Sequence, residues 1–482
     1  MVELSARTLH RLPSHVRVPA YDRDGLRAGI VHIGVGNFHR VHQAVAVQRC
    51  LEQPGHEDWA ICGIGILDGP EARAKAEAFR RQDGLHTVTA FAADGSKAVE
   101  VVGAMADYLH APADPDAALR RLAAPGTRIA SLTITEGGYG LDKALAESGG
   151  AGRPRTAFDY LVEALDRRRR AGLPPFTVMS CDNLRSNGDT SRAAVLALAE
   201  RRDGELAAWI ERHGAFPNSM VDRIAPRVTA ADRQALNAFS GIEDALPASC
   251  ESYTNWVMED RFCNGRPPLE RAGVSLRDDV AAFEAVKGRL SNAAHMLLAY
   301  PAVLLGYRLI NEAMRDGRLV RLLQDFWTLD AIPLVTPPPG LSPQVFTAQV
   351  LERFANPGID DQVLRVAHDG ASKLVVFHAR TLAQLIAGNG PLEREAFLFA
   401  CFARYLLGVE DGGATFPVDE PRLDAADWAR IRGGDPLAVL HLSPFTELRL
   451  PESERFRDAF ARAAQALAAK GAGRALAELV GG

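Results

Sequence analysis

Four short apolar runs in the first half of the chain limit its fold more than any other feature. They cover residues 29–38, 58–67, 127–135 and 175–183. Apolar runs of this length without regular polar alternation are typical of strands buried on both faces of a sheet. Segments with helical patterns lie between them. The alternation predicts an α/β fold whose N-terminal, Rossmann-type domain is built on a doubly wound parallel sheet.

The pattern changes near residue 285, after which helical segments follow one another almost without interruption. Pro- and Gly-rich pieces such as TPPPGLSP, residues 336–343, separate these segments. A chain of 482 residues also exceeds what one hydrophobic core usually serves. We therefore expect two domains, a Rossmann-type domain over residues 1–285 and a mainly α-helical domain over residues 286–482.

Charge and composition exclude several classes of protein. The 55 basic and 60 acidic side chains give a formal net charge of −5, so the chain as a whole has no basic character suited to nucleic acid. Its six cysteines are scattered without a CxxC pair, which is typical of reduced thiols and not of a disulfide scaffold or a zinc site. The sequence shows neither a signal peptide nor a long apolar segment. We expect a cytoplasmic protein without a membrane partner.

A glycine-rich turn follows the first apolar run and leads into a predicted helix. Gly34 and Gly36 allow the backbone to turn tightly and to approach a pyrophosphate at the start of the helix. His39 replaces the third glycine of the usual GxGxxG pattern, which leaves an ordinary strand-to-helix turn as the alternative. The strand–turn–helix context favours dinucleotide binding. The candidate residues are Gly34, Val35, Gly36, Asn37, Phe38, His39 and Arg40.

Polar residues follow the other apolar runs, at the end of the strands where a doubly wound sheet binds its ligands. Asp68 follows the second run and is the candidate for binding the adenosine ribose, where a carboxylate favours NAD by repelling the 2′-phosphate of NADP. Thr135 and Glu136 follow the third run and are further cofactor candidates. Asn183 follows the fourth run and can donate its amide to a substrate oxygen. The alternative is ordinary turn chemistry, with Asp68 as a solvated turn carboxylate.

The segment that opens the helical half carries a second set of polar residues, namely Glu284, Lys287, Asn292 and His295. At 100° per residue these four side chains spread over ~200° of helix arc, which is too broad for one tight face. They converge only where the helix begins inside a cleft. Polar residues in so apolar a helix need partners, and the alternative is a solvent-exposed stripe.

Five motifs occur together and in order along the chain. They are GVGNFHRVHQA (34–44), SLTITEGGY (131–139), SCDNLRSNG (180–188), FPNSMVDRIAP (216–226) and Lys287-x4-Asn292-x2-His295. Together they resemble the mannitol dehydrogenase family, the polyol-specific long-chain dehydrogenases/reductases, and most closely its mannitol 2-dehydrogenases. The resemblance covers nearly the whole chain, and the glycine-rich motif of that family also lacks the third glycine.

The resemblance implies an oxidoreductase that uses NAD to interconvert a polyol and its ketose, which are D-mannitol and D-fructose in the mannitol 2-dehydrogenases. The first domain would bind NAD, and the second would carry the catalytic base. A monomer is also implied. The implied roles are Lys287 as general acid/base, Asn183 and Asn292 as the oxyanion hole, His295 and Glu284 beside the lysine, and Asp222, Arg365 and Lys373 as substrate-binding residues.

The chemistry of this set is coherent. Oxidation of a secondary alcohol removes the hydroxyl proton while hydride leaves for the nicotinamide. A free lysine, with a pKa of about 10.4, is mostly protonated at pH 7, so burial or neighbouring cations must lower the pKa of Lys287 for it to act as a base. Asparagine amides would stabilise the developing alkoxide. Since no HExxH or paired Cys/His spacing is present, we expect a metal-independent reaction.

Other functions remain open from sequence alone. Within the family they are arabinitol or sorbitol dehydrogenases and fructuronate or tagaturonate reductases; a uronate needs an extra cation, which Arg365 or Lys373 can supply. A sugar-acid epimerase that uses NAD transiently would produce no net NADH. A dinucleotide-sensing regulator would bind NADH without turning over a polyol. A short-chain dehydrogenase would need a Tyr-x-x-x-Lys pair, which is not found in the required place.

Overall fold

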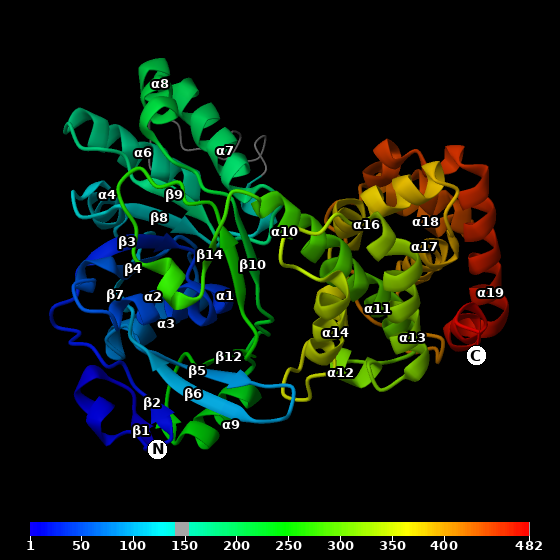
Figure 1. Ribbon diagram of the computed structural model, residues 1–482, viewed down its shortest axis with the longest axis horizontal. Coiled ribbons are helices and arrows are strands. Elements are labelled where there is room, and N and C mark those ends of the chain that lie inside the picture. Colours follow the sequence, from blue (N-terminus) through cyan, green and yellow to red (C-terminus); the bar gives the residue numbers. More distant parts are fainter. Residues whose placement is uncertain (140–153, 482) are drawn as a thin grey trace. The chain divides into compact units, whose positions relative to one another are not determined.

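The computed structural model describes residues 1–139 and 154–481, and it divides into two compact units, Met1–Ala281 and Ala282–Gly482 (Figure 1). Helix α10, Val280–Lys287, runs across this division. The domain boundary that we expected after residue 285 lies within the same helix, four residues beyond the division (285 − 281).

A five-stranded parallel sheet forms the centre of the first unit. Its strand order is β7-β4-β3-β8-β9, and every neighbouring pair is parallel (Figure 1). Because β3 lies in the middle, the chain winds first toward one edge and then toward the other, which confirms the predicted doubly wound Rossmann-type fold. The strands are β3 Ala28–Ile33, β4 Ala60–Gly65, β7 Met105–His110, β8 Ile129–Leu132 and β9 Thr177–Ser180.

Helices cover both faces of this sheet. Successive strand residues point to opposite faces, so each strand contributes side chains to the buried clusters on both sides. Ile30 of β3 belongs to a buried cluster that includes residues of α2, whereas its neighbour Val31 belongs to a second cluster that includes residues of α6. A strand buried on both sides is mostly apolar, which is why these runs could be found in the sequence. The helices of this unit are α1 Asn37–Val41, α2 Gln43–Leu51, α3 Pro70–Arg81, α4 Pro115–Ala123, α6 Ala157–Arg170, α7 Asn187–Arg202, α8 Gly204–His213 and α9 Ala230–Ser240.

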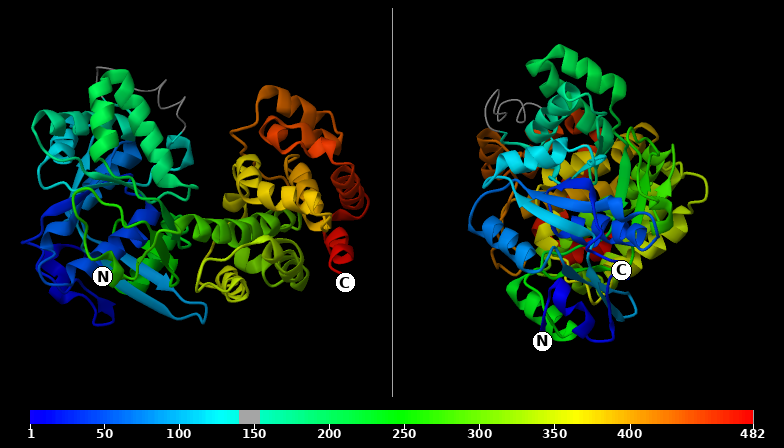
Figure 2. Two further views of the ribbon diagram at one scale, coloured as in Figure 1. Left: turned by 45° about the horizontal axis from the view of Figure 1, so that its top comes forward. Right: turned by 90° about the vertical axis from the view of Figure 1, so that its left-hand side faces the viewer.

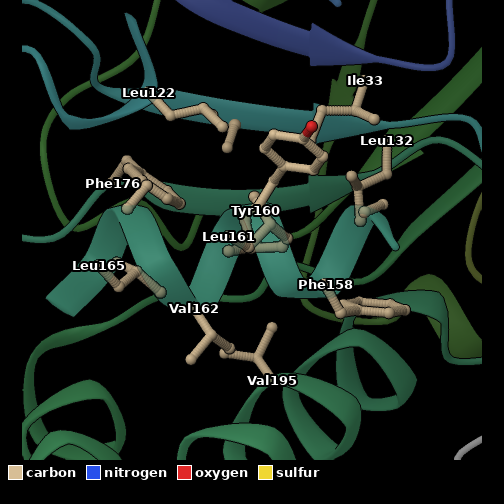
Figure 3. Packing of buried hydrophobic residues seen from close by; sticks show 14 of the residues in the cluster. Ile33, Leu122, Leu132, Phe158, Tyr160, Leu161, Val162, Leu165, Phe176 and Val195 are labelled. Carbon is tan, nitrogen blue, oxygen red and sulfur yellow. The ribbon is translucent and has the colours of Figure 1, made fainter. Parts of the chain in front are cut away.

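Helix α6 shows how the second cluster is built. Thr156 caps its first turn by accepting a hydrogen bond from the backbone N–H of Asp159. Phe158, Leu161 and Leu165 recur at helical spacing and are buried among strand residues such as Leu132 (Figure 3). Each such side chain stabilises the fold by about 1.5–3 kcal/mol when it is fully buried.

Three features of the first unit were not predicted. The edge strand β7 lies outside the four apolar runs, and only its first residue is buried. The single helix expected after the glycine-rich turn is divided at the buried residue His42 into α1 and α2. Short strands also form smaller sheets beside the main one. These strands are β1 Val2–Glu3, β2 Val16–Arg17, β5 His86–Phe91, β6 Lys97–Val102, β10 Ser219–Asp222, β11 Ile242–Glu243, β12 Ala248–Glu251, β13 Asn255–Met258 and β14 Ser275–Leu276.

The second unit is built from helices around the buried helix α11, as the sequence predicted (Figure 2). All residues of α11 from Met296 to Leu304 are buried. Among the described residues, no helix has both the length and the apolar composition needed to cross a membrane. The helices are α11 Ala293–Leu304, α12 Ile310–Ala313, α13 Gly317–Asp325, α14 Pro343–Phe354, α15 Val363–Ala367, α16 Gly370–Ala387, α17 Glu393–Tyr405, α18 Ala425–Arg432 and α19 Glu454–Leu479.

Candidate active site

The glycine-rich turn lies at the carboxyl end of β3, between this strand and α1. Gly34 has a φ of 96°, and a Cβ atom there would lie 2.1 Å from the carbonyl oxygen of Thr133. Only glycine fits this position without moving the backbone. The backbone N–H of Gly36 donates to the Gly34 carbonyl at 2.6 Å, which closes the turn. A turn this tight, bare of side chains at Gly34 and Gly36, fits the close approach of a dinucleotide pyrophosphate.

The side chains that follow the turn point into the protein. His39 is 1% exposed, stacks on His32 at 3.5 Å between ring centroids, and places Nδ1 3.0 Å from Gln43 Oε1. Burial lowers the pKa of His39 well below its usual value, so the ring is neutral near pH 7. Arg40 is also buried and donates to the Leu246 carbonyl and to Asn37 Oδ1. The buried side chains of His39 and Arg40, which were both predicted to bind the cofactor, therefore stabilise the turn from the protein interior.

The remaining predicted residues of this segment also have structural contacts. Val35 is buried in a small cluster with Phe79 and Met105. Asn37 donates its side-chain amide to the Pro226 carbonyl at 3.0 Å. Phe38 stacks on His42 with 4.7 Å between ring centroids. The chemistry that this segment offers a ligand therefore comes mainly from its backbone.

Asp182 organises the ends of two neighbouring strands, although it was not selected as a candidate site residue from the sequence. Its buried carboxylate accepts hydrogen bonds from the backbone N–H groups of Ile134 and Thr135, each at 2.9 Å, and from the Tyr139 hydroxyl at 2.7 Å. Burial raises the pKa of this carboxyl group. Asn183 follows directly and is exposed, so Asp182 fixes the backbone beside a side chain that is open to ligands.

Three further predicted residues of the first unit occupy different environments. Thr135 has a φ of 63°, in the left-handed region that residues with a β-branch rarely adopt. Glu136 begins a short 3-10 helix, and its side chain lies outside the described part of the structure. Asp222 ends β10 and is buried, with Asn255 opposite it on β13.

Asp68 lies beyond the end of β4 and is largely solvated, with 58% of its side chain exposed. It pairs with Arg73 at 2.9 Å and accepts a hydrogen bond from the backbone N–H of Gly69 at 2.7 Å. The Gly69 N–H, followed by the Arg73 side chain, lowers the pKa of Asp68, so the carboxylate is ionised at neutral pH. It lines a shallow cavity of about 390 Å³ together with His110.

Lys287 ends helix α10 and is buried, with 7% of its surface exposed. A π-helical turn, Gly288–Asn292, joins α10 to α11. The prediction that the polar side chains spread over a broad arc assumed uniform α-helical spacing, and the π-turn changes that spacing by adding a residue to the turn. Glu284 and Asn292 are each half-buried on either side of Lys287 along the chain. π-Helical turns are frequent at functional sites.

His295, on α11, is surrounded by charged groups of the second unit. Its Nε2 lies 3.5 Å from the buried carboxylate of Asp361, too far for a good hydrogen bond, and it makes no hydrogen bond to any described residue. The ring stacks on Phe354 with 4.4 Å between centroids. Burial lowers the pKa of His295 to about 4; Asp361 opposes this shift, whereas Arg365 and Lys373 reinforce it. His295 is therefore neutral at pH 7.

The two predicted substrate-binding cations of this unit lie near His295, since both influence its pKa. Arg365 donates two hydrogen bonds to Asp361, each at 2.7 Å. Lys373 donates to the backbone carbonyls of Val366 and His368. Asp361 was missed in the sequence because a single aspartate carries no motif, although its i,i+4 spacing to Arg365 could have suggested the pair.

Within the described residues, no group of three His, Cys, Asp or Glu side chains is arranged to bind a metal ion.

The site has the elements of a dinucleotide-dependent oxidoreductase, and comparison with known proteins identifies the family. The family model of the mannitol dehydrogenase Rossmann domain matches residues 28–271, and that of the mannitol dehydrogenase C-terminal domain matches residues 279–468. The chain belongs to the mannitol dehydrogenase family.

Relatives and solved structures agree over nearly the full length. The chain is 44% identical to a polyol:NADP oxidoreductase of Gluconobacter oxydans over 92% of this chain and 93% of the relative. It is 37% identical to a mannitol 2-dehydrogenase of Phaeosphaeria nodorum, over 99% and 85%. A substrate-free D-sorbitol dehydrogenase matches with a TM-score of 0.88 at 41% identity, covering 99% of this chain and 100% of that one. Pseudomonas fluorescens mannitol 2-dehydrogenase, in a ternary complex with NAD and D-mannitol, matches with a TM-score of 0.91 at 37% identity and full coverage of both chains.

Proposed function

We propose that this protein is a monomeric, metal-independent polyol dehydrogenase that uses NAD to interconvert D-mannitol and D-fructose. The observation that carries the proposal is the buried Lys287 at the π-turn, in a member of the mannitol dehydrogenase family. The named relatives act on polyols, and the solved mannitol 2-dehydrogenase binds NAD and D-mannitol. The turn at Gly34 fits a dinucleotide.

In this proposal each residue has one chemical task. Bound NAD supplies the acceptor for the hydride that leaves the carbinol carbon. Lys287, when neutral, takes the proton of the same hydroxyl group, and in the reverse direction it returns a proton to the ketose oxygen. The amides of Asn183 and Asn292 donate to that oxygen as negative charge develops on it. Neutral His295 has a free Nε2 with which to bind a substrate hydroxyl.

The environment of Arg365 favours a neutral polyol over a uronate. A carboxylate substrate requires a cation that is not already neutralised. Both donor groups of the Arg365 guanidinium that face Asp361 are engaged in a bidentate ion pair with a carboxylate that is 2% exposed. Recruitment of Arg365 by a substrate carboxylate would leave Asp361 buried without its partner. Arg365 is therefore a poor candidate for binding the carboxylate of a fructuronate or tagaturonate.

The assignment is tested by assaying mannitol, arabinitol, sorbitol, fructuronate and tagaturonate with NAD(H) and NADP(H), following the absorbance of the reduced cofactor. We expect the highest kcat/KM with the mannitol–fructose pair. A higher kcat/KM with another polyol would change the assigned substrate but not the assigned reaction. Activity with uronates alone would contradict the role given to Arg365, and cofactor binding without turnover of any substrate would contradict an enzymatic function.

Removal of metal ions is expected to leave the activity unchanged. In this proposal Lys287 transfers the hydroxyl proton and the two amides stabilise the negative charge on the oxygen, so no metal ion is needed. The enzyme is dialysed extensively against EDTA and then assayed for mannitol oxidation beside an undialysed sample. The same treatment of a zinc-dependent alcohol dehydrogenase shows that the chelation is effective. Loss of activity that Zn²⁺ restores would rule out the metal-free mechanism.

Replacement of Asp68 by Ala is expected to raise kcat/KM with NADP relative to NAD by about tenfold. The change removes a negative charge that would repel the 2′-phosphate and releases Arg73 from its partner. Glu211→Ala is the matched control, since Glu211 is an exposed carboxylate on α8 that pairs with Arg192 and does not line the cavity at Asp68. A wild-type enzyme that already prefers NADP would show that Asp68 does not select the cofactor.

A further inference from the structure

Lys75 reaches the glycine-rich turn from a different helix. It lies on α3, the helix that follows β4, and its Nζ donates a hydrogen bond to the carbonyl of Val35, between Gly34 and Gly36. A lysine ammonium carries three N–H donors, and this contact uses one of them. All of these residues belong to the first unit. The turn proposed to receive the pyrophosphate thus has a cation at its edge.

The charge of Lys75 is not balanced by an acid. Burial lowers its pKa to about 8, Arg40 adds to the shift, and no acidic group contributes to it. Within the described part of the chain, no carboxylate forms an ion pair with Lys75, whereas Arg73 and Arg80 on the same helix pair with Asp68 and Glu77.

The positive charge of Lys75 also interacts with two neighbouring groups, His32 and Arg40. The Lys75 charge helps to lower the pKa of the buried His32, although burial is the larger cause. Lys75 and Arg40 repel each other across the same turn, which is an unfavourable arrangement in the absence of an anion. A hydrogen bond that only holds α3 to the Val35 carbonyl would need just a neutral donor, and placing a half-buried cation there costs free energy.

We propose that Lys75 binds a phosphate group of the dinucleotide at the glycine-rich turn. The inference rests on the proposed dinucleotide-dependent function and adds a residue that contacts the cofactor. The phosphate is either the pyrophosphate, which NAD and NADP share, or the ribose 2′-phosphate, which only NADP carries. Either phosphate supplies the anion that Lys75 lacks, through a charge-assisted hydrogen bond to its remaining N–H groups.

The test compares wild type with Lys75→Gln, Lys75→Met and Lys75→Arg. Gln keeps a donor for the Val35 carbonyl without the charge, Met removes both, and Arg keeps the charge. The dissociation constants of NADH and NADPH are measured by titration of the full-length protein, and thermal unfolding reports on the fold of each variant. Arg81→Gln is the control, since Arg81 is an exposed cation near the end of the same helix.

We expect Lys75→Gln to weaken binding by about tenfold or more, and Lys75→Arg to restore most of the affinity. Weaker binding of both nucleotides identifies the pyrophosphate, and weaker binding of NADPH alone identifies the 2′-phosphate. Either result supports the proposal when Arg81→Gln binds like wild type.

The proposal is overturned if folded Lys75→Gln binds both nucleotides like wild type, because Lys75 would then act only as a tie to the turn. It is also overturned if Arg81→Gln weakens binding as much as Lys75→Gln, since the effect would then be a general one of surface charge. If Lys75→Met does not fold, the comparison of Lys75→Gln with Lys75→Arg still tests whether the charge is needed for binding. Failure of wild type to bind either nucleotide would instead refute the proposed function, and the two failures are thereby distinguished.

Discussion

Replacement of Lys287 by Met is expected to lower kcat for polyol oxidation by about 10²–10⁴-fold, while NADH binds nearly as tightly as to wild type. The lysine is proposed to move the substrate proton, and it has no part in binding the pyrophosphate. Methionine fills a similar volume, so the buried position is not left as a cavity. Steady-state kinetics and an NADH titration on the same preparation separate the two effects.

The pH dependence gives a second measurement of the same role. Oxidation requires neutral Lys287, so kcat/KM for the polyol rises with pH to a plateau in wild type, whereas ketose reduction requires the protonated form and falls. Lys287→Met should lose this dependence in both directions. In Lys287→Ala, a small amine added to the assay should restore part of the rate by occupying the vacated space.

Lys470→Met is the matched control, because Lys470 is an exposed lysine of the second unit that pairs with Glu478. It should retain the activity and the pH profile of wild type. Near-normal kcat in folded Lys287→Met would place the base elsewhere. His295 would then be the next candidate, although burial lowers its pKa to about 4 and makes it a weak base at neutral pH.

The sequence was sufficient to predict four of the five strands of the main sheet, because β3, β4, β8 and β9 are buried on both faces. The edge strand β7 is buried only at its first residue and was not predicted. Ile30 and Val31 face opposite clusters, so neither position can be polar, and the run stands out from its surroundings. The strands β5 and β6 mix polar with apolar residues. They pair with each other, and β5 also pairs with β12, which lies more than 140 residues away in the chain (Val88 with Ala248). Such pairing depends on tertiary contacts that no local pattern records.

The candidate site residues were selected through motifs, and residues without a motif were not selected. Lys287 and Asn292 were recognised by their spacing, whereas Asp182 and Asp361 act through hydrogen bonds and charges that depend on the folded chain. Lys75 was missed for the same reason, since its target is a backbone carbonyl 40 residues earlier in the chain. The π-turn at Gly288–Asn292 also could not be predicted, because helical periodicity assumes uniform spacing.

The second large effect concerns the two amides. Asn183→Ala and Asn292→Ala are each expected to lower kcat by about 10²–10³-fold without shifting the pH profile. In the proposed mechanism each amide donates to an oxygen that carries more negative charge in the transition state than in the bound substrate, so its loss should affect kcat more than KM. Asn183 is exposed and Asn292 is half-buried, so neither change should unfold the protein.

Asn264→Ala is the matched control for these variants, since Asn264 is a half-buried asparagine outside the proposed site, and it should behave like wild type. The double variant Asn183→Ala/Asn292→Ala tests whether both amides serve the same oxygen. If they do, kcat falls by less than the product of the single effects, because water can solvate an oxygen that has lost both donors. Single variants that raise KM and leave kcat unchanged would show instead that the amides bind the ground state and form no oxyanion hole.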